Sequence, residues 1–185
     1  ATAVVAAIGA SELDLNNTSV DIALDTNQTA DVIQVNAMVA GQTLANGTRT
    51  ATISATVSTS ALDASDDATN NLLALNTTTA DAIAITVGGT ADAAQLVTLT
   101  GKTSLVVDAE AVTNITGSYV EFKGNGSDVA GLWNMASTLD ILPADYDVTI
   151  SDTSLAPEFI TEIANATTGA VSGTANVTTI DGTIA

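Results

Sequence analysis

The side chains of this sequence that could do chemistry are almost all carboxylates. The chain has 21 Asp and Glu residues against three Lys and Arg residues, and it contains neither Cys nor His. Without these two residue types, a thiol nucleophile, a disulfide framework, a Cys₄ zinc site and the usual general base are all excluded. The composition therefore predicts that the protein is not an enzyme.

Calcium is the cofactor that the carboxylates favour. Asp outnumbers Glu by 16 to 5, as expected where carboxylates occupy loops and turns, and calcium takes oxygen ligands from loops. Neither of two Asp clusters has the spacing of an EF-hand, and solubility together with Asx turns is the alternative explanation. The candidate calcium ligands are Asp63, Asp66, Asp67, Asp140, Asp145 and Asp147.

Asp152-Thr153-Ser154, after a predicted strand, has the form of an aspartic protease motif. Such a protease needs two aspartates that share a proton. A second copy in the same context is lacking. A turn at the end of a strand is the better interpretation of these residues.

All five aromatic residues fall within 41 positions of each other, between 119 and 159. Tyr and Trp dominate binding hot spots, so this region could form an interaction patch or bind sugar. The alternative is that the bulky side chains fill a local core. The interaction candidates are Tyr119, Phe122, Trp133, Tyr146 and Phe159.

Asparagine is unusually often followed by the pattern x-Ser/Thr. Nine of the 13 Asn residues begin such a triplet, which could mark a glycoprotein with modified loops. Turn-forming residues also cluster together without being glycosylated. The glycosylation candidates are Asn16, Asn17, Asn27, Asn46, Asn76, Asn114, Asn125, Asn165 and Asn176.

The charge and hydropathy narrow the range of partners. A formal net charge of -18 repels a phosphate backbone, so nucleic acid is not expected as a partner. No stretch approaches the roughly 20 apolar residues of a membrane-spanning helix, so no membrane insertion is expected. The sequence starts at Ala1 without a basic-led hydrophobic leader, so it is expected to be either a processed protein or a fragment. An exported, extracellular location is the simplest expectation.

The elements that must position these residues are predicted to be mainly strands in the region 1–60. Runs 19–25 and 50–58 alternate apolar and polar residues, and 31–39 is more continuously apolar. This region is predicted to be a small β-sheet. Residues 1–10 form a short apolar segment that could add as a strand to the open sheet of a neighbouring subunit.

The region 61–185 shows a degenerate repeat of a β run, a loop or short helix, and a turn. The β runs begin at Ala82, Ser104, Ser118, Asp147 and Ala170. Residues 74–85 and 163–173 are close copies, as are 112–118 and 177–183, so one unit stacked on its neighbours is expected. The predicted fold is a β-solenoid-like repeat region with short helical connections; the alternative is an antiparallel β-sandwich throughout.

The repeats resemble those of a known class of proteins. Runs of the form L-x-x-L-x-x-x-T-T-G-x-V and A-x-x-V-T-x-I-x-G-T, as in EIANATTGAVSGTANVTTIDGTIA, resemble the degenerate repeats of large exported surface and S-layer-like proteins of cyanobacteria and other bacteria. The resemblance covers 61–185. It implies an extracellular, self-associating, architectural role, sometimes with bound calcium and without catalytic residues. The Gly-Gly-x-Gly-x-Asp nonapeptide of calcium-loaded repeats is absent from this sequence.

The sequence thus predicts an acidic structural protein at the cell surface. We expect a homo-oligomer or polymer of like modules that builds a surface layer or filament by self-assembly. A monomeric adhesin that binds a surface polysaccharide is the alternative.

Overall fold

The structure of the chain is a computed structural model. It describes residues 22–23, 32–42, 49, 52–59, 71–125, 131–135, 139–140, 142–173 and 179–180. The chain divides into two compact units, each formed by several segments. The first comprises Ala1–Thr59, Ala64–Thr86 and Leu99–Val107, and the second comprises Ser60–Asp63, Val87–Thr98 and Asp108–Ala185.

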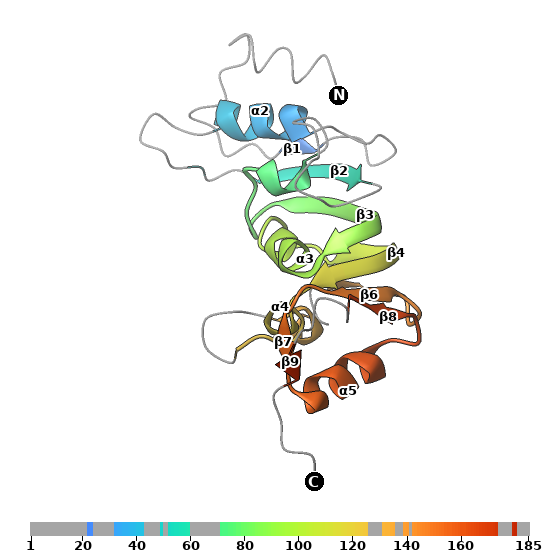
Figure 1. Ribbon diagram of the computed structural model, residues 1–185. Helices are drawn as coiled ribbons and strands as arrows, with labels where there is room; N and C mark the ends of the chain where they lie inside the picture. Colours follow the sequence, from blue (N-terminus) through green and yellow to red (C-terminus); the bar gives the residue numbers. More distant parts are fainter. Residues whose placement is uncertain are drawn as a thin grey trace. The chain divides into compact units, whose positions relative to one another are not determined.

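The first unit contains a short run of neighbouring strands and one long helix (Figure 1). Its elements are β1 (Ile22–Ala23), α2 (Val32–Gln42), β2 (Ile53–Thr59), the 3₁₀ turn η1 (Leu72–Ala74) and the first part of β3 (Ala82–Asp92). Strand β1 pairs with β2 in parallel, with Ile22 opposite Ile53, and β2 is the next neighbour of β3.

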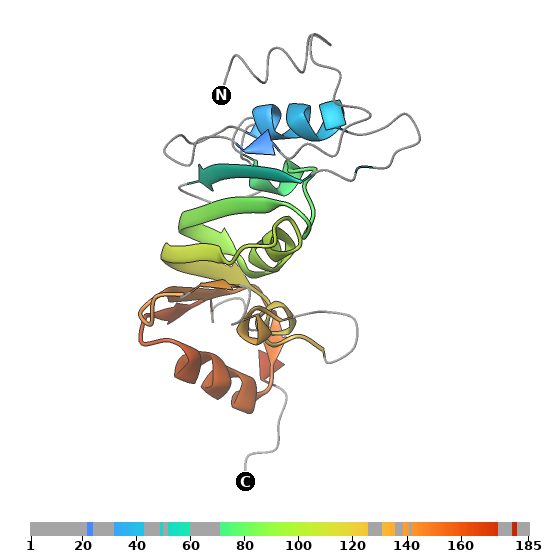
Figure 2. The ribbon, with the colours of Figure 1, turned by 180° about the vertical axis from the view of Figure 1, so that it is seen from behind.

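Helix α2 corrects the prediction that 31–39 is a strand. Its buried side chains include Val32, Val35 and Met38, and this spacing of three places them on one face of a helix. Several β-branched residues and the length of the apolar run favoured a strand. Packing of this face against β2 stabilises the helix instead. Helix α2 lies beside β2 in both views (Figures 1 and 2).

The second unit holds the remainder of β3 and the elements that follow it, except for Leu99–Val107, which belongs to the first unit. In chain order these are α3 (Ala93–Thr100), β4 (Val107–Gly117), α4 (Tyr119–Lys123), η2 (Leu132–Asn134), β5 (Leu139–Asp140), β6 (Asp147–Ile150), β7 (Ser154–Leu155), α5 (Pro157–Ala166), β8 (Val171–Ser172) and β9 (Thr179–Ile180). Strands β3, β4, β6 and β8 are neighbours in that order, β5 pairs with β4, and β7 pairs separately with β9.

The strand pairs whose register is known run parallel. Asn114 of β4 lies opposite Asp147 of β6, and Val148 of β6 lies opposite Val171 of β8. A parallel pair needs a crossover connection, which is usually helical. Here α5, which begins with Pro157 at a position where proline is favoured, lies in the connection from β6 to β8.

This arrangement corrects the predicted fold class. The chain has a parallel α/β fold, and it is neither a β-solenoid nor an antiparallel β-sandwich. The strands alternate between buried and half-buried positions, whereas strands of parallel sheets usually read as continuous hydrophobic runs. The alternation of apolar and polar residues therefore favoured a mainly β fold. In the structure, helices lie in the connections between parallel strands.

One predicted β run is a helix for a local reason. The run from Ser118 is helix α4, and Ser118 forms a capping box with Glu121. The Glu121 N–H donates to the Ser118 hydroxyl oxygen, and the Glu121 carboxylate accepts from the Ser118 N–H and hydroxyl. A capping box satisfies the free N–H groups at a helix start. Gly124 follows Lys123 with φ of 80° and ends the helix.

The core is built from medium-sized aliphatic side chains. Helix α3 begins after Asp92, whose Oδ1 accepts a hydrogen bond from the Gln95 N–H at 3.1 Å, and it buries Leu96 and Leu99.

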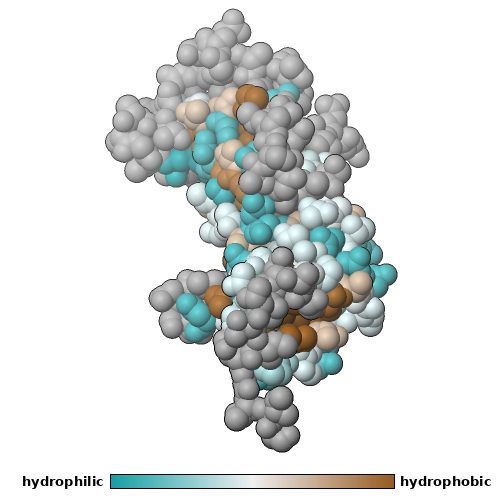
Figure 3. Space-filling model, viewed as in Figure 1, coloured by the Kyte–Doolittle hydropathy of each residue, from teal (hydrophilic) through white to brown (hydrophobic). Residues whose placement is uncertain are grey.

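On the face shown in Figure 3, the described surface is mainly pale or hydrophilic. Among the described residues, no helix is long and apolar enough to cross a membrane.

Candidate functional site

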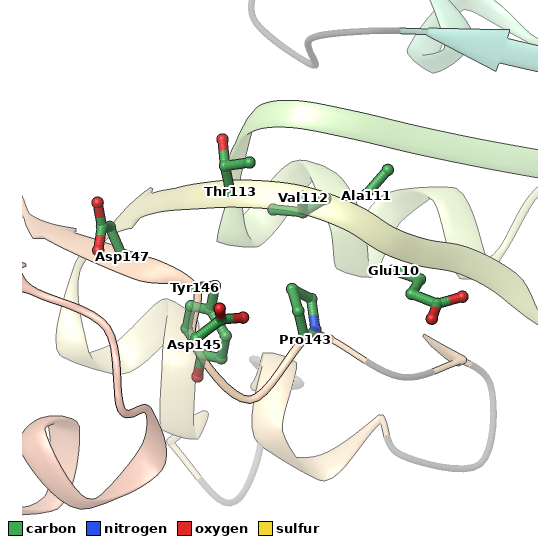
Figure 4. Close-up of a pocket in the computed structure, with 8 residues that line it drawn as sticks. All are labelled: Glu110, Ala111, Val112, Thr113, Pro143, Asp145, Tyr146 and Asp147. Carbon is green, nitrogen blue, oxygen red and sulfur yellow. The ribbon is translucent and has the colours of Figure 1, made fainter.

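A pocket of about 330 Å³ lies in the second unit beside strand β4 (Figure 4). The pairing of β4 with β6 begins where Asn114 lies opposite Asp147. The pocket is formed just before this point, between β4 and the turn that leads into β6. Its lining residues are Glu110, Ala111, Val112, Thr113, Pro143, Asp145, Tyr146 and Asp147.

Three carboxylates line this pocket, and all three residues are exposed: Glu110, Asp145 and Asp147. Figure 4 shows Glu110 at one end of the pocket and Asp147 at the other. Asp147 Oδ1 accepts a hydrogen bond from the Ala170 N–H at 2.7 Å. The pocket is an acidic recess, and its carboxylates favour cationic or hydroxyl-bearing groups.

The structure brings together two of the predicted calcium ligands, Asp145 and Asp147. The side chain of Asp140 in β5 and the cluster Asp63, Asp66 and Asp67 lie outside what the structure describes. In the described part of the chain, no three Asp or Glu residues form a group that could hold a metal ion. Calcium binding at these residues stays a prediction.

Tyr146 forms the most buried polar side chain of the pocket wall. Its side chain is 3% exposed, its hydroxyl donates to the Ala166 carbonyl, and Trp133 Nε1 donates to the hydroxyl, both at 3.4 Å. Burial raises the pKa of Tyr146, and the hydrogen bond from Trp133 opposes this rise only in part. The phenol therefore stays protonated and serves as a structural wall of the pocket.

The five aromatic residues lie close together in the second unit. The Tyr119 ring stacks on Phe159 with centroids 4.0 Å apart, and it meets Trp133 edge-on at 6.4 Å. Phe122 lies 5.5 Å from Trp133. Tyr119, Phe122 and Tyr146 are buried and the other two are half-buried. The rings contact each other, as a local aromatic core requires.

Glu162 of helix α5 binds two side chains of helix α4, one of them in the aromatic cluster. Its Oε2 accepts hydrogen bonds from the Tyr119 hydroxyl at 2.5 Å and from Lys123 Nζ at 2.6 Å. Burial, followed by the bond to Glu162, raises the pKa of Tyr119. The bond to Lys123, followed by that to Tyr119, lowers the pKa of Glu162. The three groups thus form a link between α4 and α5.

No family model, curated protein or solved structure matches this chain. The function has to be inferred from its own residues.

Two threonines share three contacts in different parts of the chain, and Thr103 Oγ1 accepts one further hydrogen bond, from the Ile83 N–H at 3.0 Å. Thr103 Oγ1 lies 3.3 Å from the Asp81 carbonyl oxygen and 2.6 Å from that of Ile83, and it accepts from the Leu105 N–H at 3.0 Å. The Ser104 N–H and hydroxyl both donate to the Asp81 carbonyl. Thr103 therefore ties the turn before β4 to the start of β3.

Thr167 repeats this arrangement in the second unit. Its Oγ1 lies 3.2 Å from the Ala144 carbonyl oxygen and 2.5 Å from that of Tyr146, and it accepts from the Gly169 N–H at 2.9 Å. The Thr168 N–H and hydroxyl donate to the Ala144 carbonyl. We call these two turns, Thr103–Leu105 and Thr167–Gly169, the threonine corners.

Each threonine corner stands four positions before a residue of the strand that follows. Thr103 precedes Val107 at the start of β4, and Thr167 precedes Val171 at the start of β8. Both threonines are nearly fully buried, where a hydroxyl must be hydrogen-bonded to avoid a large cost. The corners thus join each strand to its neighbour through hydroxyl and backbone groups rather than charges.

A ladder of polar side chains crosses the strands of the second unit. Thr149 Oγ1 donates to Asn114 Oδ1 at 3.1 Å and lies 3.1 Å from Ser172 Oγ. The ladder links β4, β6 and β8. Asn114 is also a candidate for glycosylation, and its amide oxygen is engaged in this ladder.

The other glycosylation candidates divide between exposed positions and undescribed segments. Asn76, Asn125 and Asn165 are exposed. Asn16, Asn17, Asn27, Asn46 and Asn176 lie outside the described residues. Glycosylation stays a prediction for all nine.

The sequence interpretation missed the buried charge of the first unit. Asp81 is 0% exposed, and its carboxylate accepts from Arg49 and from the Ile53 and Thr78 backbone N–H groups. The chain has three basic residues, and the position of Arg49 next to a predicted strand was the one sign in the sequence that a buried ion pair could form. The sequence does not show which of 21 carboxylates would meet Arg49.

Proposed function

We propose that this protein is an extracellular structural module that self-associates into a surface layer or filament. The observation that carries the proposal is the threonine corner. The same contacts tie β4 to β3 and β8 to β6, so one way of adding a strand is used more than once. Extended segments add to exposed sheet edges in many assemblies, so a strand from a second copy would continue this order of strands.

The distribution of charge supports a role in assembly over one in catalysis. The described cations are all engaged: Arg49 with Asp81, Lys102 Nζ with the Leu75 carbonyl, and Lys123 with Glu162. The pocket beside β4 offers carboxylates but neither a His nor a Cys, since the chain has none. A histidine base and a cysteine nucleophile are therefore excluded from this pocket.

The aromatic cluster weighs against the adhesin alternative. A sugar-binding platform presents a ring face to solvent, but the face of Tyr119 stacks on Phe159, and Phe122 is fully buried. Four of the five rings are linked by direct ring contacts, and Tyr146 joins them through Trp133. We therefore place the self-association proposal first.

Electron microscopy of the purified chain tests the proposal. We expect ordered fibres or sheets at physiological ionic strength. Calcium should promote them and a chelator should reduce them, because a chain with a net charge of -18 repels its copies until cations offset the charge. A protein that stays monomeric at high concentration with and without calcium would contradict the proposal.

A further inference from the structure

The strand β8 ends the order of neighbouring strands in the second unit. Among the described strands, β8 has β6 as its one neighbour, and the order begins at β1 in the first unit. The last described strand of the chain, β9, pairs with β7 instead of β8. In the part of the chain that the structure describes, the far edge of β8 is therefore without a strand partner.

The backbone direction of β8 identifies the groups at this edge. Val148 lies opposite Val171, and the Val148 N–H donates to the Ala170 carbonyl at 2.8 Å. Backbone groups of successive residues in a parallel strand point alternately to its two neighbours. The N–H and C=O of Val171 therefore point away from β6.

The residues of this edge lack the side chains that usually block strand addition, although its two-residue length is itself a form of protection. Natural edge strands carry charges, especially Lys, or Pro residues that block pairing. The segment Ala170-Val171-Ser172-Gly173 has neither a charge nor a Pro, and Ala170 and Ser172 are exposed. The short length of β8 limits the strength of one contact, but β6 forms pairs on both its edges with only four residues.

We propose that the free edge of β8 accepts strand β1 of a second copy in parallel, with Val171 opposite Ile22. This inference rests on the proposed self-association and names the surface that carries it. Within the chain each pairing of known register is parallel. Strand β1 of the next copy would pair with β8 in the same parallel direction. Ile22 already lies opposite the buried Ile53, as Val171 lies opposite the buried Val148.

The contact is heterologous, because β8 of one copy meets β1 of another. Such a contact leaves one free β8 and one free β1 at the ends of every complex, so it generates open filaments unless the rotation closes a ring. The second copy is the favoured occupant over a basic partner because the edge segment itself is uncharged and strand pairing is made by backbone hydrogen bonds.

The Val171→Pro variant tests the proposal. Proline removes the N–H that points away from β6 and is tolerated on an edge strand, so the variant should keep its fold but lose the ability to accept β1. Val171→Ala is the matched control, because it also loses the side chain but keeps the N–H. We expect fibres from the wild type and from Val171→Ala, and a loss of at least tenfold in fibre mass for Val171→Pro.

A mixing experiment separates a blocked edge from a fold that has failed. Val171→Pro keeps β1, so a small fraction of it added to wild type should occupy free β8 edges, stop growth and shorten the fibres; an unfolded variant cannot do so. Fibres of unchanged length, or a Val171→Pro protein that assembles like wild type, would overturn the edge pairing alone. If the wild type itself stays monomeric, the proposed function fails as well.

Discussion

Arg49 and Asp81 form a two-pronged ion pair in the interior of the first unit. Arg49 Nη1 lies 2.6 Å from Asp81 Oδ1, and Nη2 lies 2.5 Å from Oδ2. The same carboxylate accepts the backbone N–H groups of Ile53 and Thr78 at 2.9 Å each. Asp81 therefore connects the start of β2, the segment before β3 and the chain around residue 49.

We expect Asp81→Asn to destabilise the first unit strongly. The substitution leaves the Arg49 guanidinium without its buried counter-charge, and breaking a buried pair in this way costs about 3–5 kcal/mol. Urea unfolding followed by circular dichroism measures this loss. Glu110→Gln is the control, because this exposed carboxylate should change the free energy of unfolding by less than about 0.5 kcal/mol. Equal stability of the two variants would contradict the role given to Asp81.

The same carboxylate predicts how stability depends on acid. Burial raises the pKa of Asp81, but the hydrogen bonds from Arg49, Thr78 and Ile53 and the charge of Arg49 outweigh this, so the pKa is lowered below 3.8. A group with a lowered folded pKa contributes stability that is present above its unfolded pKa and is lost as pH falls through the folded value. Acid titration of the unfolding free energy should therefore show a loss below about pH 4, and this loss should be smaller in Asp81→Asn.

The threonine corner should be sensitive to removal of its hydroxyl. Thr167→Val keeps the shape of the side chain but leaves the Tyr146 carbonyl and the Gly169 N–H without this partner. A buried group left unsatisfied costs about 1–3 kcal/mol. Thr168→Val is the comparison: it removes an exposed hydroxyl that donates to the Ala144 carbonyl, which keeps the Thr168 N–H as a partner, and it should cost only about 0.5 kcal/mol. Thr103→Val should behave like Thr167→Val, and a cost near zero for both would show that the corners do not stabilise the sheet.

Close backbone contact makes Gly169 a second test of the corner. A Cβ at Gly169 would lie 2.3 Å from the Tyr146 carbonyl oxygen, whereas a Cβ at Gly88 would lie 3.4 Å from Ala111 Cβ. Gly169→Ala should therefore displace the segment before β8 and cost about 1–3 kcal/mol or more through overpacking. Gly88→Ala should be tolerated. Hydrogen exchange of the β8 amides would report the displacement directly, and unchanged protection in Gly169→Ala would argue against this packing.

Trp133 offers a direct measurement of the aromatic cluster, since it is the one Trp of the chain. Its ring lies near Tyr119 and Phe122 and is half-buried. Trp133→Phe should retain most of the stability, whereas Trp133→Ala should lose about 2 kcal/mol or more, below the ~3–5 kcal/mol of a fully buried ring. Calorimetry of the two variants checks this. A stable Trp133→Ala protein that has lost binding to a polysaccharide would instead favour the adhesin.

Several elements could be predicted from the local pattern of the chain. The strand runs predicted from Ala82, Asp147 and Ala170 correspond to β3, β6 and β8, and helices α3 and α5 lie in connections for which a loop or a short helix was predicted. Strand direction could not be read in this way, because an alternating strand looks the same in a parallel and an antiparallel pair. The helix at 32–42 was missed since β-branched residues favour strands unless tertiary packing selects the helix.

The candidate sites depended still more on long-range contacts. The proximity of the aromatic residues in the chain suggested their cluster, and the structure shows that Tyr119 and Phe159 stack. The equivalence of Thr103 and Thr167 could not be read from the sequence, because Thr103 lies outside the copies 74–85 and 163–173 and the contacts are made to carbonyl groups about 20 residues upstream.

The sequence alone determined the chemistry that is open to this protein. The lack of Cys and His, the excess of carboxylates and the scarcity of aromatic residues follow from composition and hold for any fold. Only the tertiary structure decided that Arg49 meets Asp81, 32 residues away, and that strands β4, β6 and β8 become parallel neighbours. Pairing of distant segments depends on which buried surfaces fit together, and the free energy of that fit is not contained in any local stretch of the chain.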